Sequence, residues 1–513
     1  MQQPILSGLS ENCETKPSNR QGHADRAVNI AAPLLFGICM TNVEDRVEML
    51  DQPLTCQLVR LSGARLLISL CLCFLAACNA DNNPLNALGS NSPFGGNTMQ
   101  TSEVERRGSP DSCTVPDMNA WVYRNMLDYY LFYDQVERNL AVENFETSES
   151  LVEALRVQPQ DRFSYMTDEN TYEAFFNEGE TFGFGWSVSR AQDNQVYFSL
   201  IDPGSPLALS GIERGDRLVS INQMLIDDFF ALRSDEKSAI IGNDGEPRTL
   251  SLMVADENDT SRQVSVTSST YAVETVLNNQ VIDRNGVRIG YLNFYSFINS
   301  ASVDLREAFS TLAAWDIDEL ILDLRFNSGG RISVANELAS HILGDGNTDK
   351  VFTTLAYNDQ YSSNNVSLSF LEMSNKLDLY RVFVLQSPGT CSASELVING
   401  LRPFMEVITI GASSCGKPYG SQPNAACGKV LNALEIDLVN ADGLGGYYDG
   451  ILADCPIAED VSIALGHEEE PLLATALGYI NQGYCDQISA RLSERADQQV
   501  SLPRPGWLGG NAL

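Results

Sequence analysis

The sequence predicts a multidomain α/β protein with a small helical N-terminal domain, a β-rich middle domain and a larger domain of βαβ units. Three observations support this prediction. The chain has 513 residues and 43% hydrophobic residues, which is enough for several cores. Apolar residues first recur at helical spacing and then form short strands between glycine-rich turns. After residue 286, predicted strands alternate with predicted helices, in the order strand Val287–Phe294, helix Val303–Trp315, strand Glu319–Arg325 and helix Ile332–Leu343.

The N-terminal part contains a predicted secretion signal. Arg60 and Arg65 precede an apolar run of about a dozen residues, which is typical of a signal peptide and too short to span a bilayer. The run ends in Leu-Ala-Ala-Cys, which resembles a bacterial lipobox. The resemblance implies cleavage before Cys78 and a lipid anchor on its thiol, and Asn79 then implies the outer membrane. The alternative is an ordinary signal peptide with a coincidental cysteine.

These features divide the first part of the chain into three segments. Residues 1–48 show no signal or domain pattern, and Met49 would be a more ordinary start, so we expect a non-native or disordered extension. Residues 49–77 are the predicted lipoprotein signal peptide. Residues 78–112 are rich in Asn, Gly, Ser and Pro and are predicted to form a flexible linker.

Charge and cysteine content limit the possible partners. The formal charge is -34, which argues against nucleic acid as a partner, because phosphate binding needs a basic surface. Six of the twelve cysteines follow Cys78, and an even number in an exported chain predicts disulfides. None has C-x-x-C spacing, so we predict neither a metal nor another cofactor. The expected pairs are Cys391–Cys415, Cys427–Cys455 and Cys113–Cys485.

The helical domain is predicted over residues 113–165. Its apolar residues recur at helical spacing from Val122 to Val136, and Thr147 marks the start of a second helix. The aromatic residues of this stretch, such as Tyr129 and Tyr130, are expected in the core.

The β-rich domain is predicted over residues 170–275. It contains a Gly-Phe-Gly-Trp turn, a Gly-Ser-Pro turn before a short helix, a Gly-Asp turn and the strand Val219–Asn222. This order resembles a PDZ domain, which binds an extended peptide as an added strand and captures its C-terminal carboxylate. The resemblance implies that Gly183, Phe184 and Gly185 form the carboxylate-binding loop, although the glycines could also serve only a hairpin.

The βαβ domain is predicted over residues 280–486, followed by a tail over 487–513. Within it, Ser392 lies on the turn between a predicted strand, Val382–Leu385, and a predicted helix, Ser394–Leu401. The free N–H groups at the start of that helix can stabilise negative charge. Lys417 lies 25 residues later, after the next buried strand. A third strand ends in Gly329 and Gly330, whose bare backbone can approach a substrate carbonyl. A serine beside a lysine in this layout suits nucleophilic acyl transfer.

Three features together resemble the S41 family of serine peptidases, the C-terminal processing or tail-specific proteases. They are the PDZ-like segment, the Leu-Asp-Leu-Arg-Phe-Asn-Ser-Gly-Gly turn, and Gly-Thr-Cys-Ser-Ala-Ser-Glu-Leu followed by Cys-Gly-Lys-Pro-Tyr-Gly. The resemblance covers most of residues 115–485. It implies a crotonase/ClpP-like βαβ protease domain, polypeptide substrates, and a periplasm-facing place in the bacterial cell envelope.

The resemblance also implies roles for single residues. Ser392 would be the nucleophile and Lys417 a neutral general base, because burial can lower a lysine pKa toward the operating pH. Gly329 or Gly330 and the N–H of Ala393 would form the oxyanion hole. Glu395 matches an acidic position of the family and would either orient the pair or only cap the helix. Ser394 is the rival nucleophile.

The sequence departs from the family pattern near the lysine. Pro418 replaces a common glycine, and Ser421 occupies a position where the family commonly has glutamine, with Gln422 next to it. His341 and His467 are expected to be structural. The alternative function is a catalytically silent PDZ-type peptide-binding lipoprotein. A crotonase-like acyl-thioester enzyme is disfavoured, because no basic cluster is present for a CoA phosphate.

Overall fold

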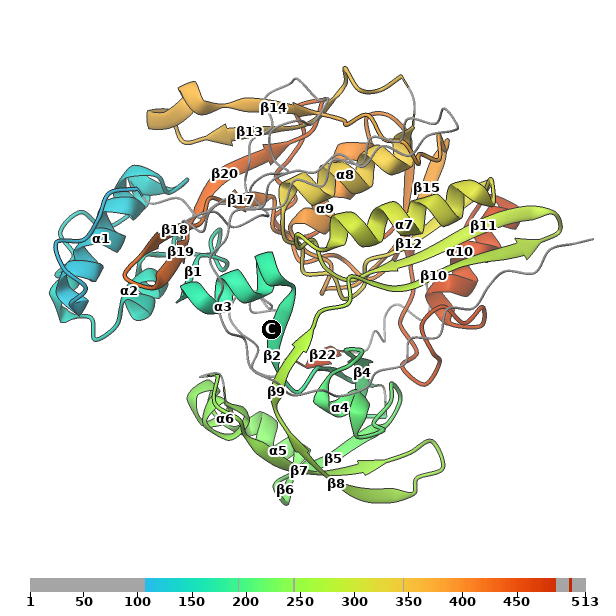
Figure 1. Ribbon diagram of the computed structural model, residues 1–513, viewed down its shortest axis with the longest axis horizontal. Helices are drawn as coiled ribbons and strands as arrows, with labels where there is room; N and C mark the ends of the chain where they lie inside the picture. Colours follow the sequence, from blue (N-terminus) through green and yellow to red (C-terminus); the bar gives the residue numbers. More distant parts are fainter. Residues whose placement is uncertain (1–106, 192, 243–244, 345, 486–497, 501–513) are drawn as a thin grey trace, which may run out of the picture. The chain divides into compact units, whose positions relative to one another are not determined.

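The computed structural model describes residues 107–191, 193–242, 245–344, 346–485 and 498–500 (Figure 1). Cys78, the predicted extension and signal peptide, and the linker up to residue 106 lie outside these described residues. The described chain is mixed α/β, which confirms that part of the prediction. No helix within it is long and apolar enough to cross a bilayer.

A six-stranded sheet forms the centre of the βαβ segment, in the order β10-β11-β12-β15-β16-β21. β10 pairs antiparallel with β11, and the remaining neighbours are parallel. The predicted strand around Val382–Leu385 is a continuous apolar run, as expected of a strand buried on both faces. The strands are β10 (Val276–Arg284), β11 (Val287–Phe294), β12 (Glu319–Asp323), β15 (Arg381–Gln386), β16 (Glu406–Gly411) and β21 (Cys455–Pro456).

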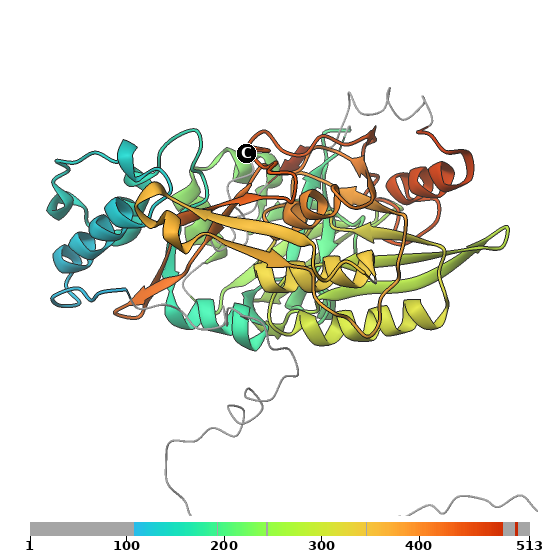
Figure 2. The same ribbon diagram turned by 90° about the horizontal axis from the view of Figure 1, so that it is seen from above.

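Helices pack on both faces of this sheet, and Figure 2 shows α10 on the side opposite to α7. One core joins Leu322 and Val384 to helices α7, α8 and α9, and the other joins Ile321 and Phe383 to α10. The alternation of side chains along each strand produces these two cores. The helices are α7 (Ala301–Ala314), α8 (Ile332–Leu343), α9 (Ala393–Leu401) and α10 (Pro471–Gln482).

Two antiparallel sheets extend from this centre and were not predicted. One has the order β14-β13-β20-β17 and the other β1-β19-β18. The four strands from β17 to β20 belong to the chain that follows Lys417, and β1, β13 and β14 precede it. Their strands are β1 (Tyr165–Asp168), β13 (Val351–Tyr357), β14 (Val366–Ser369), β17 (Tyr419–Ser421), β18 (Asn424–Ala426), β19 (Lys429–Asn432) and β20 (Leu434–Val439).

The helical N-terminal segment contains α1 (Val115–Asp128) and α2 (Ser148–Leu155). Thr147 caps α2, since its hydroxyl accepts a hydrogen bond from the Ser150 N–H at 3.1 Å. The segment shares its core with the βαβ segment. Trp121, Val122 and Tyr130 pack in one cluster with Cys391, Tyr419 and Leu434. This packing places residues 117–165 directly against the loops that carry Ser392 and Lys417.

The β-rich segment has its own core around Phe198, Leu218 and Leu252. Its sheet runs β22-β3-β4-β5-β7-β8, with β6 beside β5, and a separate β2–β9 pair joins it to the rest of the chain. Its strands are β2 (Glu180–Gly183), β3 (Trp186–Arg190), β4 (Val196–Ile201), β5 (Arg217–Ile221), β6 (Met224–Leu225), β7 (Thr249–Ala255), β8 (Ser261–Thr267), β9 (Ser269–Ala272) and β22 (Gln498–Val500). Its helices are α4 (Pro206–Leu209), α5 (Ile226–Ala231) and α6 (Ser234–Ile241).

Arg214 connects the β-rich segment to the βαβ segment through a hydrogen bond and an ion pair. Its guanidinium donates to the Ile463 carbonyl at 2.9 Å and pairs with Glu459 at 2.8 Å. Glu459 lies 3.4 Å from the fully buried Arg325, which also pairs with Asp323 and Glu470. A series of ion pairs therefore connects the β-rich segment to the end of β12, the strand that precedes Gly329.

The three disulfides among the described residues confirm one predicted pair and correct two. Cys391 is bonded to Cys415 as predicted, with a Cα–Cα distance of 5.1 Å. The pairs Cys427–Cys455 and Cys113–Cys485 were wrong, because the bonds are Cys113–Cys427 and Cys455–Cys485. Cys113 precedes α1, whose segment packs against the β18–β19 hairpin that contains Cys427. Cys485 follows α10, which lies beneath the strands next to Cys455. Cysteine spacing alone carries no information on either packing.

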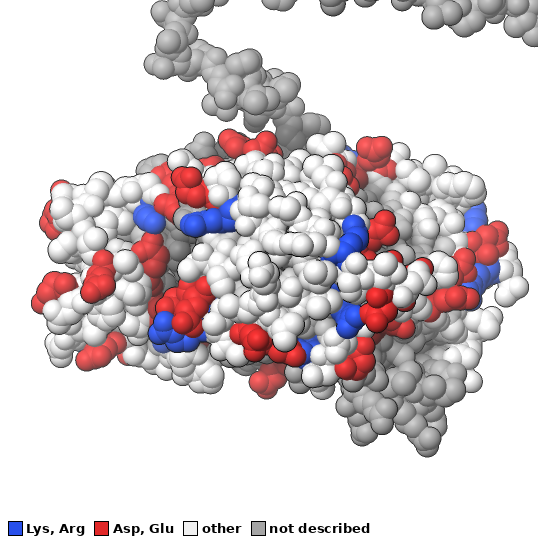
Figure 3. All heavy atoms as spheres, turned by 90° about the horizontal axis from the view of Figure 1, so that it is seen from below, with Lys and Arg blue, Asp and Glu red and all other residues white. Residues whose placement is uncertain are grey.

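Charged side chains are spread over the surface. On the face shown in Figure 3, Lys and Arg side chains occur singly or in small groups among acidic and uncharged residues. This distribution is that of a solvated surface with an acidic balance.

Candidate functional site

Ser392 lies at the start of α9 in an unusual backbone conformation. Its φ and ψ angles are 55° and -111°, a region that a residue with a side chain rarely adopts. The residue is partly exposed, whereas Ser394 is fully buried and donates its hydroxyl proton to the Asn327 carbonyl at 2.9 Å. Of the two candidate serines, only Ser392 is thus accessible to solvent.

The carboxylate of Glu395 connects the Ser392 loop to the Lys417 loop. It accepts hydrogen bonds from the backbone N–H of Ser392 at 2.9 Å and from the N–H groups of Gly416 at 2.7 Å and Lys417 at 2.9 Å. The Ser414 hydroxyl donates a fourth bond at 2.5 Å. Burial raises the pKa of Glu395, and these hydrogen bonds oppose the rise. The bond to the Ser392 N–H is the contact of a helix cap, and the bonds to Gly416 and Lys417 join the second loop to the same carboxylate.

Lys417 is partly buried, and desolvation lowers the pKa of its amine. The charges of Asp161 and Glu395 oppose this shift. No ion pair joins Lys417 to any residue within the described chain. Its Nζ lies 5.5 Å from the centroid of the Phe163 ring. An unpaired, desolvated amine is the state in which a lysine can accept a proton near neutral pH.

The surroundings of Lys417 include two residues that the sequence did not indicate. Asp161 and Phe163 follow α2 in the helical N-terminal segment. Asp161 is fully buried and accepts hydrogen bonds from the Tyr130 hydroxyl at 2.7 Å and from the N–H groups of Phe163 and Ser164. Only the shared core brings these residues to the lysine, so no local sequence signal marks them.

Gly329 lies against the Ser392 turn, and the neighbouring Gly330 lies against Phe297. A Cβ added at Gly329 would lie 2.7 Å from the Cys391 carbonyl oxygen, 2.8 Å from the Ser392 Cβ and 2.9 Å from the Ala393 nitrogen. Gly329 donates its N–H to the Asn327 side chain at 2.9 Å, whereas the N–H groups of Gly330 and Ala393 have no hydrogen-bond partner among the described residues. The Ala393 donor directly follows Ser392 in the chain, and the Gly330 donor belongs to the residue after Gly329, which contacts the Ser392 turn.

Two further sequence features lie away from the reactive pair. Gln422 accepts a hydrogen bond from Arg107 at 2.6 Å, so it is engaged outside the lysine loop. His341 stacks on Phe309 with ring centroids 4.5 Å apart, in the core between α7 and α8.

A sulfur-rich cluster at this site does not fit a metal. Side-chain atoms of Cys391, Glu395 and Cys415 lie within 4.8 Å of one another. The two sulfurs are joined in a disulfide, so neither can supply the thiolate that a metal needs.

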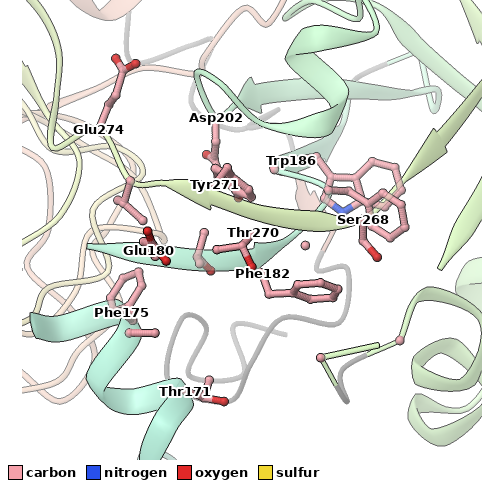
Figure 4. A pocket seen from close by; sticks show the side chains of 18 of the residues that line it. Thr171, Phe175, Glu180, Phe182, Trp186, Asp202, Ser268, Thr270, Tyr271 and Glu274 are labelled. Atoms are coloured by element: carbon pink, nitrogen blue, oxygen red, sulfur yellow. The ribbon is translucent and has the colours of Figure 1, made fainter. Parts of the chain in front are cut away.

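The loop Gly183–Gly185 borders a cavity of about 350 Å³ (Figure 4). In the figure, Phe182 of β2 and the neighbouring Phe175 lie on the side of β2 that faces Thr171, and Tyr271 lies on the adjacent strand β9. Phe175 belongs to the single π-helical turn Ala174–Glu178. Gly185 has a φ of 80°, and a Cβ at this position would overlap Ser205. Ser392 and Lys417 do not line this cavity.

Removing the Cys391–Cys415 bridge should reduce both stability and activity. We expect the Cys391→Ser/Cys415→Ser double variant to lose about 3 kcal/mol of unfolding free energy, and its kcat to fall, because the bridge joins the two reactive loops. Cys455→Ser/Cys485→Ser is the matched control, since its loop is of similar length, with sequence separations of 30 and 24. Thermal unfolding and turnover of a polypeptide measure the two effects. Equal loss of kcat in both variants would contradict a local role.

Two segments of the chain match models of known protein families. Residues 288–437 match Peptidase family S41, and residues 117–165 match the Peptidase S41 N-terminal domain. A carboxyl-terminal-processing protease of a Picosynechococcus species is 26% identical over 328 residues, covering 62% of this chain and 73% of that protein. The chloroplastic carboxyl-terminal-processing peptidase 2 of Arabidopsis thaliana is 25% identical, covering 55% of this chain and 53% of that protein.

A solved structure shows the same fold. The crystal structure of a Bacteroides fragilis protein assigned to the S41 proteases superposes with a TM-score of 0.58 at 24% sequence identity. The superposition covers 74% of this chain and 99% of that one. Together, the family matches and the relatives define a serine-type peptidase. Along this chain, the segment that matches the S41 N-terminal domain precedes the segment that matches peptidase family S41.

Proposed function

We propose that the protein cleaves polypeptides by a Ser392–Lys417 acyl-enzyme mechanism. The observation that carries the proposal is the Glu395 carboxylate, which holds the N–H of Ser392 and the N–H of Lys417 on one group. The exposure of Ser392 and the desolvation of Lys417 also support it. Glu395 acts as a positioning residue, because it holds the backbone of both loops.

In the proposed reaction, neutral Lys417 removes the hydroxyl proton of Ser392 as the serine oxygen attacks a peptide carbonyl carbon. The N–H groups of Ala393 and Gly330 stabilise the oxyanion; Gly330 is preferred to Gly329 because the latter already donates to Asn327. The protonated lysine then gives its proton to the leaving amine, which leaves an ester on Ser392. Water, deprotonated by Lys417, hydrolyses this ester and regenerates the serine.

The β-rich segment, residues 170–275, is proposed to be a PDZ-like domain that delivers substrate. Support comes from the order of its turns and strands, from the loop Gly183, Phe184 and Gly185 ahead of β3, and from the apolar cavity beside that loop. A C-terminal carboxylate would bind the loop N–H groups while the peptide adds a strand to the sheet. The βαβ segment, residues 280–486, is proposed to be crotonase/ClpP-like.

The proposed location is the periplasmic side of the cell envelope, with a lipid anchor at Cys78 in the outer membrane. Three disulfides among the described residues support an oxidising compartment. The anchor itself rests on the Leu-Ala-Ala-Cys pattern alone.

The test compares the wild type with Ser392→Ala on an unstructured polypeptide. We expect Ser392→Ala to lose turnover, because it removes the attacking oxygen. Ser394→Ala is the matched control and should keep most of the activity, since its hydroxyl is bound to Asn327. Negligible, equal turnover in the wild type and Ser392→Ala would instead favour a catalytically silent peptide-binding lipoprotein.

A further inference from the structure

The chain supplies an additional strand to its own β-rich sheet. β22 pairs antiparallel with β3, with Gln498 opposite Arg190 and Val500 opposite Val188. β3 is otherwise the outermost strand, since the order of the sheet is β22-β3-β4-β5-β7-β8. The backbone edge of β3 is therefore occupied by a segment more than 300 residues away in sequence.

This edge is the one that a substrate strand would use in the proposed PDZ-like mode. β3 begins immediately after the loop Gly183–Gly185. Because β22 is antiparallel to β3, its chain runs toward that loop from Gln498 to Val500. A peptide whose C-terminal carboxylate enters the loop would run in the same direction along the same edge. Both strands need the same N–H and C=O groups of β3, so they exclude each other.

β3 also lies close to the turn that leads to Ser392. Ser189 lines a small cavity together with Phe326, Ser387 and Pro388. Ser387 and Pro388 belong to the turn that leads from β15 to Ser392. Chain bound along β3 is thus held at the border between the β-rich segment and the peptidase segment.

We propose that the C-terminal segment containing β22 is an internal competitor of substrate at the β3 edge. The proposal rests on the peptide-binding role given above to the β-rich segment. A three-residue pairing is weak, but tethering raises its effective concentration to the order of millimolar. A substrate with a well-matched strand and carboxylate displaces it, whereas unsuitable polypeptides remain excluded. The segment therefore sets a threshold for substrate affinity.

The test weakens β22 without removing it. Gln498→Pro/Gln499→Pro removes two N–H groups, and of two consecutive strand residues one directs its N–H toward the partner strand. Gln498→Ala/Gln499→Ala keeps both N–H groups and is the matched control. Each pair is placed in a Ser392→Ala chain, so that binding is measured without cleavage. The probe is a fluorescein-labelled decapeptide that ends in leucine with a free carboxylate, followed by fluorescence anisotropy.

We expect the proline pair to lower the probe Kd by about tenfold relative to Ser392→Ala, and the alanine pair to leave it within about twofold. A chain that ends at residue 486 should match the proline pair. In the active enzyme, the proline pair should lower KM for a polypeptide while kcat stays unchanged. Hydrogen exchange of the β3 amides should be faster in the proline pair.

The outcomes separate this inference from the proposed function. Equal Kd values in all chains, with clear binding, would overturn competition by the segment and leave peptide docking intact. No binding even to the chain ending at residue 486 would overturn peptide docking and the competition with it. Unchanged exchange of the β3 amides would show that β22 does not protect this edge and would also overturn the proposal.

Discussion

Lys417→Met should lower kcat by about three to four orders of magnitude while the fold is retained. Methionine keeps an unbranched chain of similar length but has no amine to take the Ser392 proton. Lys429→Met is the matched control, because Lys429 pairs with Glu149 and Asp168 on the β1–β19 sheet and not with the reactive loops. Steady-state turnover of an unstructured polypeptide measures the effect.

Lys417 also determines the direction in which activity should change with pH. The base must be neutral, so activity rises as pH passes upward through the pKa of Lys417. Burial lowers this pKa, so the ascending limb of kcat/KM should have its midpoint below the ordinary lysine value of 10.5. A wild-type limb centred at the ordinary value, or Lys417→Met with near-normal kcat, would contradict the role of Lys417 as base.

Gly329→Ala should reduce kcat by about a hundredfold or more. The added methyl would enter space within 3 Å of the Cys391 oxygen, the Ser392 Cβ and the Ala393 nitrogen, at a φ of 99° that disfavours alanine. The turn carrying the nucleophile and the Ala393 donor would have to move. Misplacement of an oxyanion donor removes stabilisation from the transition state while substrate binding is largely retained, so the loss should appear in kcat.

Backbone strain alone is controlled by Gly443→Ala. Gly443 has a φ of 74°, and a Cβ there meets no atom within 4 Å. Both variants should lose some unfolding free energy, of the order of 1 kcal/mol, but only Gly329→Ala should lose kcat. If the two variants keep similar kcat values, the contact between Gly329 and the Ser392 turn has no role in the reaction.

Much of the βαβ segment was predictable because its apolar runs are long and end in clear turns. The predicted limits of the strand Val287–Phe294 and of the helix Ile332–Leu343 agree with β11 and α8. The antiparallel sheets containing β13 and β20 were missed, because their strands pair over large sequence separations that no local pattern records. For the same reason the helical N-terminal segment was predicted as a separate domain, whereas its core is continuous with that of the reactive loops.

At the candidate site, the sequence placed the serine, the lysine and the glycines on strand ends that the structure brings together. Only part of the hydrogen-bond network of Glu395 was predicted from the sequence, because its three backbone donors belong to two loops that meet only in the fold. Asp161 and Phe163 were missed altogether, since they approach Lys417 through tertiary packing. Two of the predicted disulfide pairs were wrong for the same reason.

The Cys113–Cys427 bond has a consequence for an enzyme that cuts peptide chains. It joins residues 314 positions apart, so nearly all of the described chain between α1 and the β18–β19 hairpin forms one covalent ring. A single cut anywhere within this ring leaves both halves attached through sulfur. Cleavage of exposed loops by the enzyme itself would therefore release no fragment until the Cys113–Cys427 bond is reduced. The helical N-terminal segment would also stay in place beside Lys417.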